Sequence, residues 1–394
     1  MRILVVNEFI GDVGGAERYT ADVCEELDRR GWDVHVAYGE KKGNNLPKVS
    51  STQVGSNVLI FPWFKTPTLE PLLKLIDHLK PDLAYLQNVL NSEAVRAVSR
   101  KVPTFRFLHD HRLFCPTGKL LWRSLKPCEK PFDSLCLLTT AWHGCMGRNP
   151  RWLLANMKVM SKAIAAARDM RAIVVASDYM KKCLVKQGFD ENSLLVNPLF
   201  SRFPVAESHE PGESCLLYVG QLSRGKGVPG LLKIADQFPE HVKLILVGEA
   251  PTKEENQAVE NGLMRLSHPE KVIRVGWKSG DDLLQLYRSS FALIMPSLWP
   301  EPFGLVGIEA LSQATPVIAF DVGGLGEWLR ATGGAELIPR GDWQKMGLAV
   351  RRLFEEAGTR KVMGEQGQAY VGREMTLQIH VDRLEEMFQA SVRP

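Results

Sequence analysis

The sequence predicts an α/β protein built from two doubly wound, parallel-sheet domains. Short apolar runs alternate with amphipathic stretches along most of the chain, which is the pattern of repeated β–α–β units. A length of 394 residues is sufficient for two domains. Residues 197–213 contain three prolines and show no periodicity, so they are interpreted as a linker between the domains.

Composition places the chain among soluble globular proteins. Apolar residues make up 45% and charged residues 24%, which are ordinary values. The sequence has no run of 18 apolar residues, so no transmembrane helix is expected. The N-terminus is apolar for only four residues and carries no cleavage pattern, so it is interpreted as a first strand and not as a signal peptide. We therefore expect a cytoplasmic protein with reduced cysteines.

Charge is distributed unevenly between the two halves of the chain. Residues 1–200 contain 28 Lys and Arg against 20 Asp and Glu, a balance of +8. The remaining residues contain 21 against 25, a balance of −4. A basic half favours contact with an anionic partner such as a membrane surface or nucleic acid. Its helix at 151–168 lacks the interleaved aromatic residues of single-strand binders, so nucleic acid is disfavoured and an anionic bilayer is retained.

The N-terminal domain is expected to span residues 1–200. A glycine-bearing loop with Gly14 and Gly15 follows the first strand, but it lacks the G-x-G-x-x-G fingerprint of dinucleotide-binding proteins. His109 follows a strand at the carboxyl edge of the sheet, where open α/β sheets bind ligands. Strands are expected at 2–6, 33–38, 58–61, 83–87, 104–108, 172–176 and 194–196, and helices at 16–30, 69–79, 92–100 and 151–168.

A basic, cysteine-containing insert is expected at about residues 111–171 of this domain. From residue 112 to 171 there are eleven Lys and Arg against three Asp and Glu. Four cysteines in a reducing compartment could hold a structural zinc ion, but no C-x-x-C pair is present, so separate buried thiols or a disulfide remain alternatives. In the helix at 151–168 one face is apolar and Lys158 and Lys162 lie off it, so the helix either faces the core or lies on an anionic bilayer. The four cysteines are Cys115, Cys128, Cys136 and Cys145.

The C-terminal domain is expected to span residues 201–375. Its first strand leads into a basic loop that contains Arg224 and Lys226 and precedes a helix starting near Pro229, an arrangement that suits a diphosphate. The last segment, residues 376–394, is predicted to be a helix that crosses back to the first domain. Strands are expected at 215–219, 242–247, 272–275, 291–295, 315–319 and 336–339, and helices at 281–290, 343–357, 360–370 and 377–391.

The stretch from Ser297 to Glu327 carries the clearest chemistry. Prolines after the strand at 291–295 force an extended turn, and a helical pattern begins near Leu305. Residues 303–305 would therefore present free backbone N–H groups at a helix N-terminus, which binds anions. Glu301 and Glu309 stand eight residues apart on either side. Carboxylates beside an anion site suit a ligand that has both phosphates and hydroxyls.

This stretch resembles the E-x7-E signature of the family-four retaining glycosyltransferases, which have the GT-B fold of two Rossmann-like domains. The strand at 315–319 and the glycine pair at 323–324 follow in the order that family shows. The basic loop is similar to the family's G-R-L-x-x-x-K-G motif, in which Lys226 matches. Gln221 replaces the arginine of that motif, and Arg224 is the candidate substitute.

The resemblance implies roles for individual residues. His109, Glu301 and Lys226 would be the catalytic set, with Glu301 on the donor-sugar hydroxyls, Lys226 on the diphosphate and His109 facing the sugar. Glu309 would grip the ribose diol. The remaining donor-binding residues implied are Gly14, Gly15 and Glu17 of a G-G-x-E loop, Arg224, the base-passing turn at Gly276, and Phe303, Gly304 and Leu305.

The implied reaction is transfer of a sugar from a nucleotide diphosphate donor, UDP- or GDP-linked, to a glycan or lipid-linked acceptor with retained anomeric configuration. The resemblance places such an enzyme in cell-surface polysaccharide or glycolipid assembly and implies no catalytic metal or other cofactor. The enzyme would be cytoplasmic, peripheral on the inner face of the membrane. The alternatives are a nucleotide-sugar epimerase or hydrolase of the same fold, and a non-catalytic nucleotide-sugar-binding scaffold.

Overall fold

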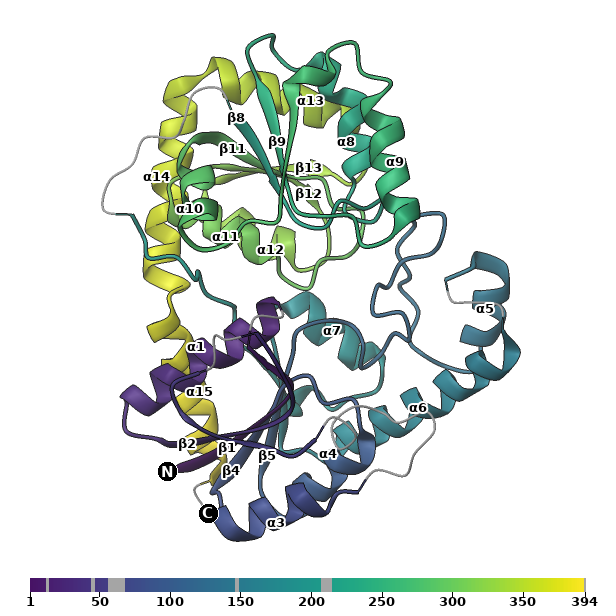
Figure 1. Ribbon diagram of the computed structural model, residues 1–394, viewed down its shortest axis with the longest axis vertical. Coiled ribbons are helices and arrows are strands. Elements are labelled where there is room, and N and C mark those ends of the chain that lie inside the picture. The colour runs from purple at the N-terminus through teal and green to yellow at the C-terminus, as the bar shows by residue number, and fades with distance from the viewer. Residues whose placement is uncertain (12–13, 44–46, 56–67, 146–148, 207–214, 393–394) are drawn as a thin grey trace. The chain divides into compact units, whose positions relative to one another are not determined.

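The structure is a computed structural model that describes residues 1–11, 14–43, 47–55, 68–145, 149–206 and 215–392 (Figure 1). The chain divides into two compact units. Unit 1 comprises Met1–Lys119, Glu129–Pro198 and Leu377–Pro394, and unit 2 comprises Leu120–Cys128 and Leu199–Thr376. Each unit contains one all-parallel sheet flanked by helices, so the predicted α/β class with two Rossmann-like domains is confirmed.

Unit 1 contains a seven-stranded parallel sheet in the order β3-β2-β1-β4-β5-β6-β7. Its central strands are buried on both faces, which is why they read as continuous apolar runs in the sequence. The strands are β1 (Arg2–Gly11), β2 (Asp33–Lys42), β3 (Ser50–Gln53), β4 (Leu83–Leu86), β5 (Thr104–Leu108), β6 (Ala172–Val175) and β7 (Leu194–Val196). The helices are α1 (Gly15–Arg29), α3 (Glu70–Leu79), α4 (Ser92–Ser99), α5 (Cys136–His143), α6 (Pro150–Arg168), α7 (Asp178–Lys186) and α15 (Leu377–Val392).

Unit 2 contains a six-stranded parallel sheet in the order β10-β9-β8-β11-β12-β13. The strand order reverses between β8 and β11, and ligands bind open α/β sheets at such switch points. The strands are β8 (Cys215–Val219), β9 (Lys243–Val247), β10 (Val272–Gly276), β11 (Ser290–Met295), β12 (Val317–Asp321) and β13 (Ala335–Pro339). The helices are α8 (Val228–Ile234), α9 (Lys253–Leu263), α10 (Gly280–Arg288), α11 (Leu305–Ser312), α12 (Leu325–Thr332), α13 (Trp343–Glu355) and α14 (Ala357–Glu374).

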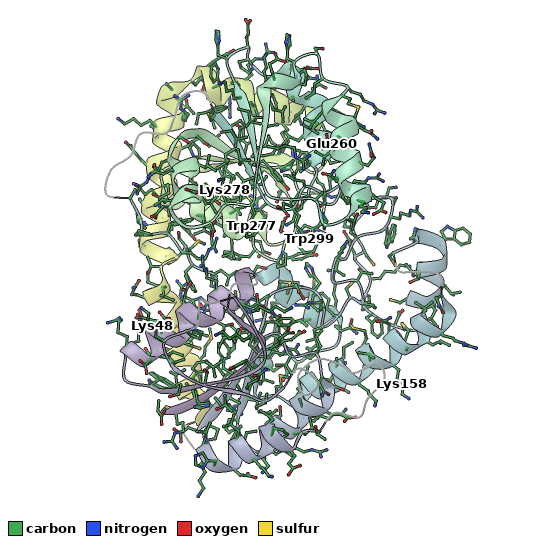
Figure 2. All side chains as sticks on the ribbon, viewed as in Figure 1. Lys48, Lys158, Glu260, Trp277, Lys278 and Trp299 are labelled. Carbon is green, nitrogen blue, oxygen red and sulfur yellow. The ribbon has the colours of Figure 1, made fainter. Side chains whose placement is uncertain are left out.

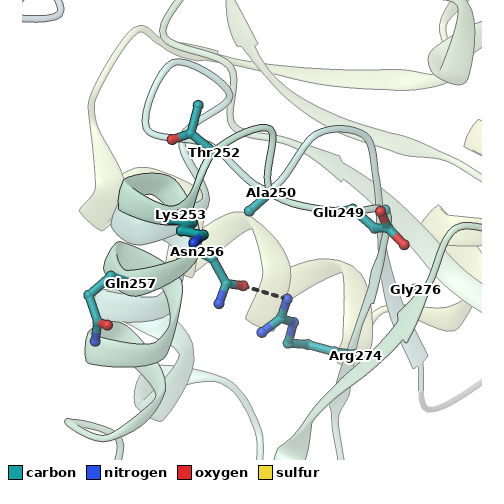
Figure 3. A pocket seen from close by; sticks show the side chains of 9 residues that line it. Glu249, Ala250, Thr252, Lys253, Asn256, Gln257, Arg274 and Gly276 are labelled. Carbon is teal, nitrogen blue, oxygen red and sulfur yellow. Dashed lines mark hydrogen bonds between the residues drawn. The ribbon is translucent and has the colours of Figure 1, made fainter.

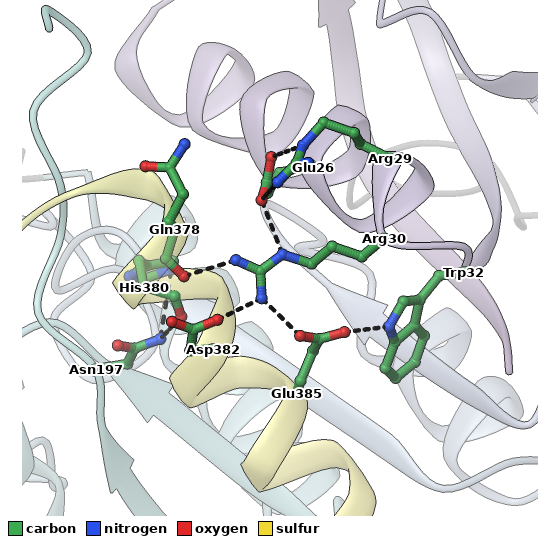
Figure 4. Close-up of polar contacts among 9 residues, drawn as sticks. All are labelled: Glu26, Arg29, Arg30, Trp32, Asn197, Gln378, His380, Asp382 and Glu385. Atoms are coloured by element: carbon green, nitrogen blue, oxygen red, sulfur yellow. Dashed lines mark hydrogen bonds and ion pairs between the residues drawn. The ribbon is translucent and has the colours of Figure 1, made fainter.

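The C-terminal helix α15 is part of unit 1, where it packs against α1 (Figure 4). Arg30, at the end of α1, donates hydrogen bonds to Asp382 at 2.5 Å and to Glu385 at 2.7 Å. The Trp32 indole N–H donates to the other oxygen of Glu385 at 2.5 Å. Phe388 is fully buried among the rings of Trp32, Tyr85 and Phe105. The apolar face of α15 therefore completes the core of unit 1, and the charged network fixes its register.

Several elements differ from the sequence expectations. The strand predicted at 58–61 lies outside the described residues. The strand β3 and the helices α5, α9 and α12 were not predicted. The insert was expected to lie wholly in the first domain, but Leu120–Cys128 belongs to unit 2, where Arg340 donates to the carbonyl oxygen of Leu125. No helix in the described ranges is long and apolar enough to cross a membrane.

Candidate functional site

Two loops of unit 2 bring Lys226 and Glu301 together. The Lys226 ammonium lies 2.6 Å from Glu301 Oε1, and 4.8 Å above the ring of Trp299. The Glu301 side chain is 7% exposed and that of Lys226 29% exposed. An ammonium has three donors, so Lys226 can keep this bond and still donate to an anion. Among the residues that the structure describes, only Oε1 of Glu301 has a side-chain partner, so Oε2 could accept from a ligand hydroxyl.

Close backbone packing fixes these loops. Gly227 has φ +81°, and a Cβ there would lie 1.9 Å from the carbonyl oxygen of Pro296. Gly323 has φ +56°, and a Cβ there would lie 2.3 Å from the carbonyl oxygen of Glu301. A side chain at either position would push the loop away, so the glycines hold Lys226 and Glu301 in register with β8 and β11.

Helix α11 begins at Leu305, shortly after Glu301 in the sequence, as predicted. Gly304 is the N-cap with φ +95°, a left-handed conformation that favours glycine. Phe303 is buried and stacks on Trp328, whose indole N–H donates to the Phe303 carbonyl oxygen at 2.8 Å. The first N–H groups of an eight-residue helix that starts at Leu305 are therefore held in a fixed direction. They supply the partial positive charge that an anion requires.

Glu309 is fully buried, and both of its carboxylate oxygens already have partners. Oε1 accepts from Arg202 Nε at 2.6 Å and pairs with the Arg202 Nη2 group at 2.5 Å. Oε2 accepts from the Tyr287 hydroxyl at 2.8 Å. A carboxylate offers about four lone-pair positions, so three are filled. A ribose diol needs two, and could therefore bind Glu309 only if an Arg202 bond opens. Burial and the adjacent carboxylate raise the pKa of Tyr287 well above its usual value.

Two other residues of the basic loop, Gln221 and Arg224, are held through their backbones. The backbone N–H of Arg224 donates to Glu255 at 2.8 Å, and the Arg224 side chain is exposed. The carbonyl oxygen of Gln221, which stands where the family has arginine, accepts from the buried Tyr218 hydroxyl at 2.7 Å. A role for Arg224 in holding phosphate therefore stays a prediction.

A cavity of about 760 Å³ opens at the carboxyl ends of β9 and β10 (Figure 3). Arg274 projects into it and donates to the Asn256 side chain at 3.0 Å. Gly276 accepts from the Gly248 N–H at 2.8 Å, and Glu249 accepts from the Leu222 N–H at 2.9 Å, so the cavity adjoins the basic loop. It is lined by Gly248, Glu249, Ala250, Thr252, Lys253, Asn256, Gln257, Arg274 and Gly276.

In unit 1, His109 is held by polar and aromatic neighbours at the end of β5. Its Nε2 is hydrogen-bonded to the side-chain amide oxygen Oε1 of Gln87 at 2.8 Å. The rings of Tyr19 and Phe107 contact it, with centroids 5.0 and 4.8 Å away. Burial lowers the pKa of His109 to about 4, so the imidazole is neutral at pH 7. Its neighbour His111 is fully buried against Phe114.

The glycine loop starts α1, with Gly14 as N-cap and Gly15 as the first helical residue. Glu17 is buried, and its carboxylate accepts from Asn88 at 3.5 Å. The structure adds Glu8, a buried carboxylate in the last part of β1 that was not predicted as a site residue. Burial raises the pKa of Glu8, and Arg112 partly opposes this shift. The sequence carried a signal for Glu8, since an acidic residue follows an apolar run near the ligand-binding edge of the sheet.

The four cysteines of the insert are divided between the two units. All are free thiols, and Cys128 belongs to unit 2 whereas the other three belong to unit 1. Cys115 lies 3.3 Å from the Thr117 hydroxyl and Cys145 lies 3.5 Å from that of Thr140. Within the described ranges, no group of three or more His, Cys, Asp or Glu could hold a metal ion. The structural zinc stays a prediction.

Comparison with known proteins assigns both units. Residues 13–198 match the model described as Glycosyltransferase Family 4, and residues 202–370 match Glycosyl transferases group 1. The uncharacterized glycosyltransferase MJ1607 of Methanocaldococcus jannaschii is 33% identical over 30% of this chain and 30% of its own length. The D-inositol 3-phosphate glycosyltransferase of Nocardia farcinica is 24% identical over 84% of this chain and 76% of its own.

Solved structures agree on the fold. The structure of Anabaena Alr3699/HepE in complex with UDP superposes with a TM-score of 0.72 at 19% identity, over 99% of this chain and 100% of that one. The lipopolysaccharide glycosyltransferase WaaG superposes with a TM-score of 0.66 at 14% identity, over 98% and 99%. With two parallel-sheet units, each matched by a glycosyltransferase model, the chain belongs to the family-four glycosyltransferases and has the GT-B fold.

Proposed function

We propose that this glycosyltransferase moves a sugar from a UDP- or GDP-linked donor to a glycan or lipid-linked acceptor, with retained anomeric configuration and without a catalytic metal. The observation that carries the proposal is the Lys226–Glu301 pair in the same loops that lead to the α11 N-terminus. A cation and oriented N–H groups suit the departing diphosphate, and a carboxylate suits sugar hydroxyls. The UDP in the HepE complexes supports a nucleotide donor of this kind.

Each residue then has a role in the transfer. Lys226 and the N–H groups at 303–305 stabilise the charge that develops on the diphosphate as the glycosidic bond breaks. Glu301 orients the sugar through Oε2 while Oε1 holds Lys226. His109, neutral and fixed by Gln87, is proposed to contact the donor sugar from unit 1. Glu17 of the glycine loop is proposed to contact the donor or the acceptor.

The cavity beside Gly276 is proposed to receive the nucleotide base, and Glu309 the ribose. The cavity adjoins the basic loop, so a nucleotide whose diphosphate lies on that loop could place its base there. For the ribose to bind Glu309, Arg202 must first give up one of its bonds to that carboxylate. The acceptor is proposed to belong to cell-surface polysaccharide or glycolipid assembly, as the name of the capsular polysaccharide relative CapM of Staphylococcus aureus suggests.

A donor panel tests this proposal. The purified protein is incubated with UDP-, GDP-, ADP- and dTDP-sugars, with and without EDTA, and thermal stabilisation and slow nucleotide release are measured. One stabilising donor that is hydrolysed with retained configuration, unaffected by EDTA, supports the proposal. Glu301→Gln should abolish release, whereas the exposed Glu355→Gln should not. Release of a sugar epimerised at C2 would indicate an epimerase. Binding of a donor with no nucleotide release, even when cell extracts are added as a source of acceptor, would indicate a scaffold.

A further inference from the structure

The short helix α5 presents an apolar stripe to solvent. Leu135, its N-cap residue, is 53% exposed, Leu138 is 68% exposed and Trp142 is 87% exposed. Spacings of three and four residues place all three on one face of the helix. On the other side, Thr140 is buried. These large apolar side chains therefore point away from the core, whereas those of an ordinary surface helix point toward it.

The next helix in the chain, α6, also exposes an apolar side chain and adds positive charge. Leu154 is 61% exposed. Arg151 and Lys158, three residues before it and four after it, are also exposed and share its face (Figure 2 labels Lys158). The opposite face of α6 carries Met160 and Ile164, which are buried. Leu154 therefore lies on the solvent-facing side of α6, away from the side that packs in the core.

The concentration of exposed apolar side chains is local. Four of the eleven large hydrophobic residues that are exposed in the described ranges fall between residues 135 and 154. The same region of sequence, 112–171, has eleven Lys and Arg against three Asp and Glu. Tryptophan and leucine flanked by cations is the side-chain set of a segment that lies at an anionic bilayer surface. At eight residues, α5 is far too short to span one.

We propose that the α5–α6 segment docks on an anionic lipid bilayer. Trp142, Leu138, Leu135 and Leu154 enter the headgroup and upper acyl region. Arg151 and Lys158 lie among the lipid phosphates. This deepens the proposed membrane-borne acceptor, since it identifies which face of unit 1 meets the lipid, but its test measures lipid binding and not transfer. Either can therefore fail without the other.

Vesicle co-sedimentation tests the proposal with the full chain. The vesicles are phosphatidylcholine alone, or phosphatidylcholine with 30% phosphatidylglycerol (about one lipid in three), at low and at high salt. The wild-type protein should bind only the anionic vesicles and be released by salt. The double variant Leu138→Ser/Trp142→Ser should bind at least about tenfold more weakly, because it removes the two most exposed anchors. Arg151→Gln and Lys158→Gln should each weaken binding about fivefold.

Matched controls separate docking from general effects. Met264→Ser and Leu348→Ser change apolar side chains in unit 2 that are 75% and 58% exposed, and should leave lipid binding unchanged. Trp142→Phe keeps an aromatic anchor and should retain most of the binding. All the altered positions are exposed, so the melting temperature should stay within a few degrees of wild type.

Three results would overturn the proposal. The first is a wild-type protein that ignores anionic vesicles at low salt. The second is a Leu138→Ser/Trp142→Ser variant that binds them as tightly as wild type. The third is sedimentation velocity in which the wild type is a dimer and the double variant a monomer, which would make the stripe a contact between copies of the chain. Nucleotide binding measured on the same samples reports separately on the transferase site.

Discussion

Removal of the Tyr287 hydroxyl should lower the free energy of unfolding of unit 2 substantially, although the substitution deletes only one heavy atom. Tyr287→Phe keeps the ring and leaves no cavity, but Glu309 Oε2 loses its 2.8 Å donor. Both side chains are fully buried, so water does not replace the hydroxyl. The carboxylate keeps its charge through Arg202 and is left with an unsatisfied acceptor.

The expected magnitude follows from that geometry. A hydrogen bond to a charged group contributes about 1.5–3 kcal/mol, and full burial places this one in the upper half of the range. A loss of about 2–3 kcal/mol in the free energy of unfolding lowers the melting temperature of a domain of this size by roughly 5–10 °C. Arg202→Met breaks the ion pair from the other side. It should cost about 3 kcal/mol, the lower end for a buried pair, because Arg202 is 25% exposed.

Urea unfolding followed by circular dichroism measures these losses. The double variant should be less destabilised than the sum of the two single variants, because both act on the same carboxylate. Tyr370→Phe, a half-buried tyrosine of unit 2, is the control and should change stability by less than about 0.5 kcal/mol. A Tyr287→Phe variant as stable as this control, or strictly additive losses, would refute the role given to the cluster.

Three other outcomes follow from the site. Lys226→Gln should weaken nucleoside diphosphate binding by about tenfold to a hundredfold in calorimetry, whereas Lys233→Gln, an exposed lysine of α8, should not. If Glu309 holds the ribose, wild-type protein should prefer UDP or GDP over the 2′-deoxy analogue, and Glu309→Gln should lose that preference; equal ratios in both proteins would remove Glu309 from the nucleotide site. The pKa of His109 is lowered to about 4, so between pH 6.5 and 4 the unfolded chain binds a proton that folded unit 1 does not. Neutral His109 therefore costs no stability above about pH 6.5, and acidification to pH 4 should lower the free energy of unfolding by about 3 kcal/mol. In urea unfolding at a series of pH values, His109→Gln should reduce this dependence on pH.

The elements that the sequence predicted well are those whose signal is local. The apolar run 291–295 and the Pro-rich turn after it predicted β11 and the start of α11, because a buried strand and a proline are read from adjacent residues. The glycine at position 304 was part of the same local pattern. Edge elements were harder: β3 (Ser50–Gln53) is polar and mostly exposed, so it carries no apolar alternation.

The partners of the site residues could not be predicted in this way. Arg202 is 107 residues from Glu309, and Tyr287 is 22 residues from it, so only the packing of the linker segment against α10 and α11 brings them together. The exposed apolar side chains of α5 were not predicted either, because hydrophobicity alone does not show which side of a helix faces solvent. Leu138 and Trp142 look like core residues in the sequence, and only the structure shows that their face is exposed.

The proposed transfer depends most on the Lys226–Glu301 pair, which precedes the α11 N-terminus, and one measurement tests this pair directly. Binding and slow hydrolysis of each UDP- and GDP-sugar are followed for wild type, Glu301→Gln and Glu355→Gln, with the anomer released identified by NMR. Wild type and Glu355→Gln should hydrolyse one donor with retention, whereas Glu301→Gln should still bind the nucleotide but release no sugar. Turnover by Glu301→Gln at the wild-type rate, or release of the inverted anomer, would contradict this proposal.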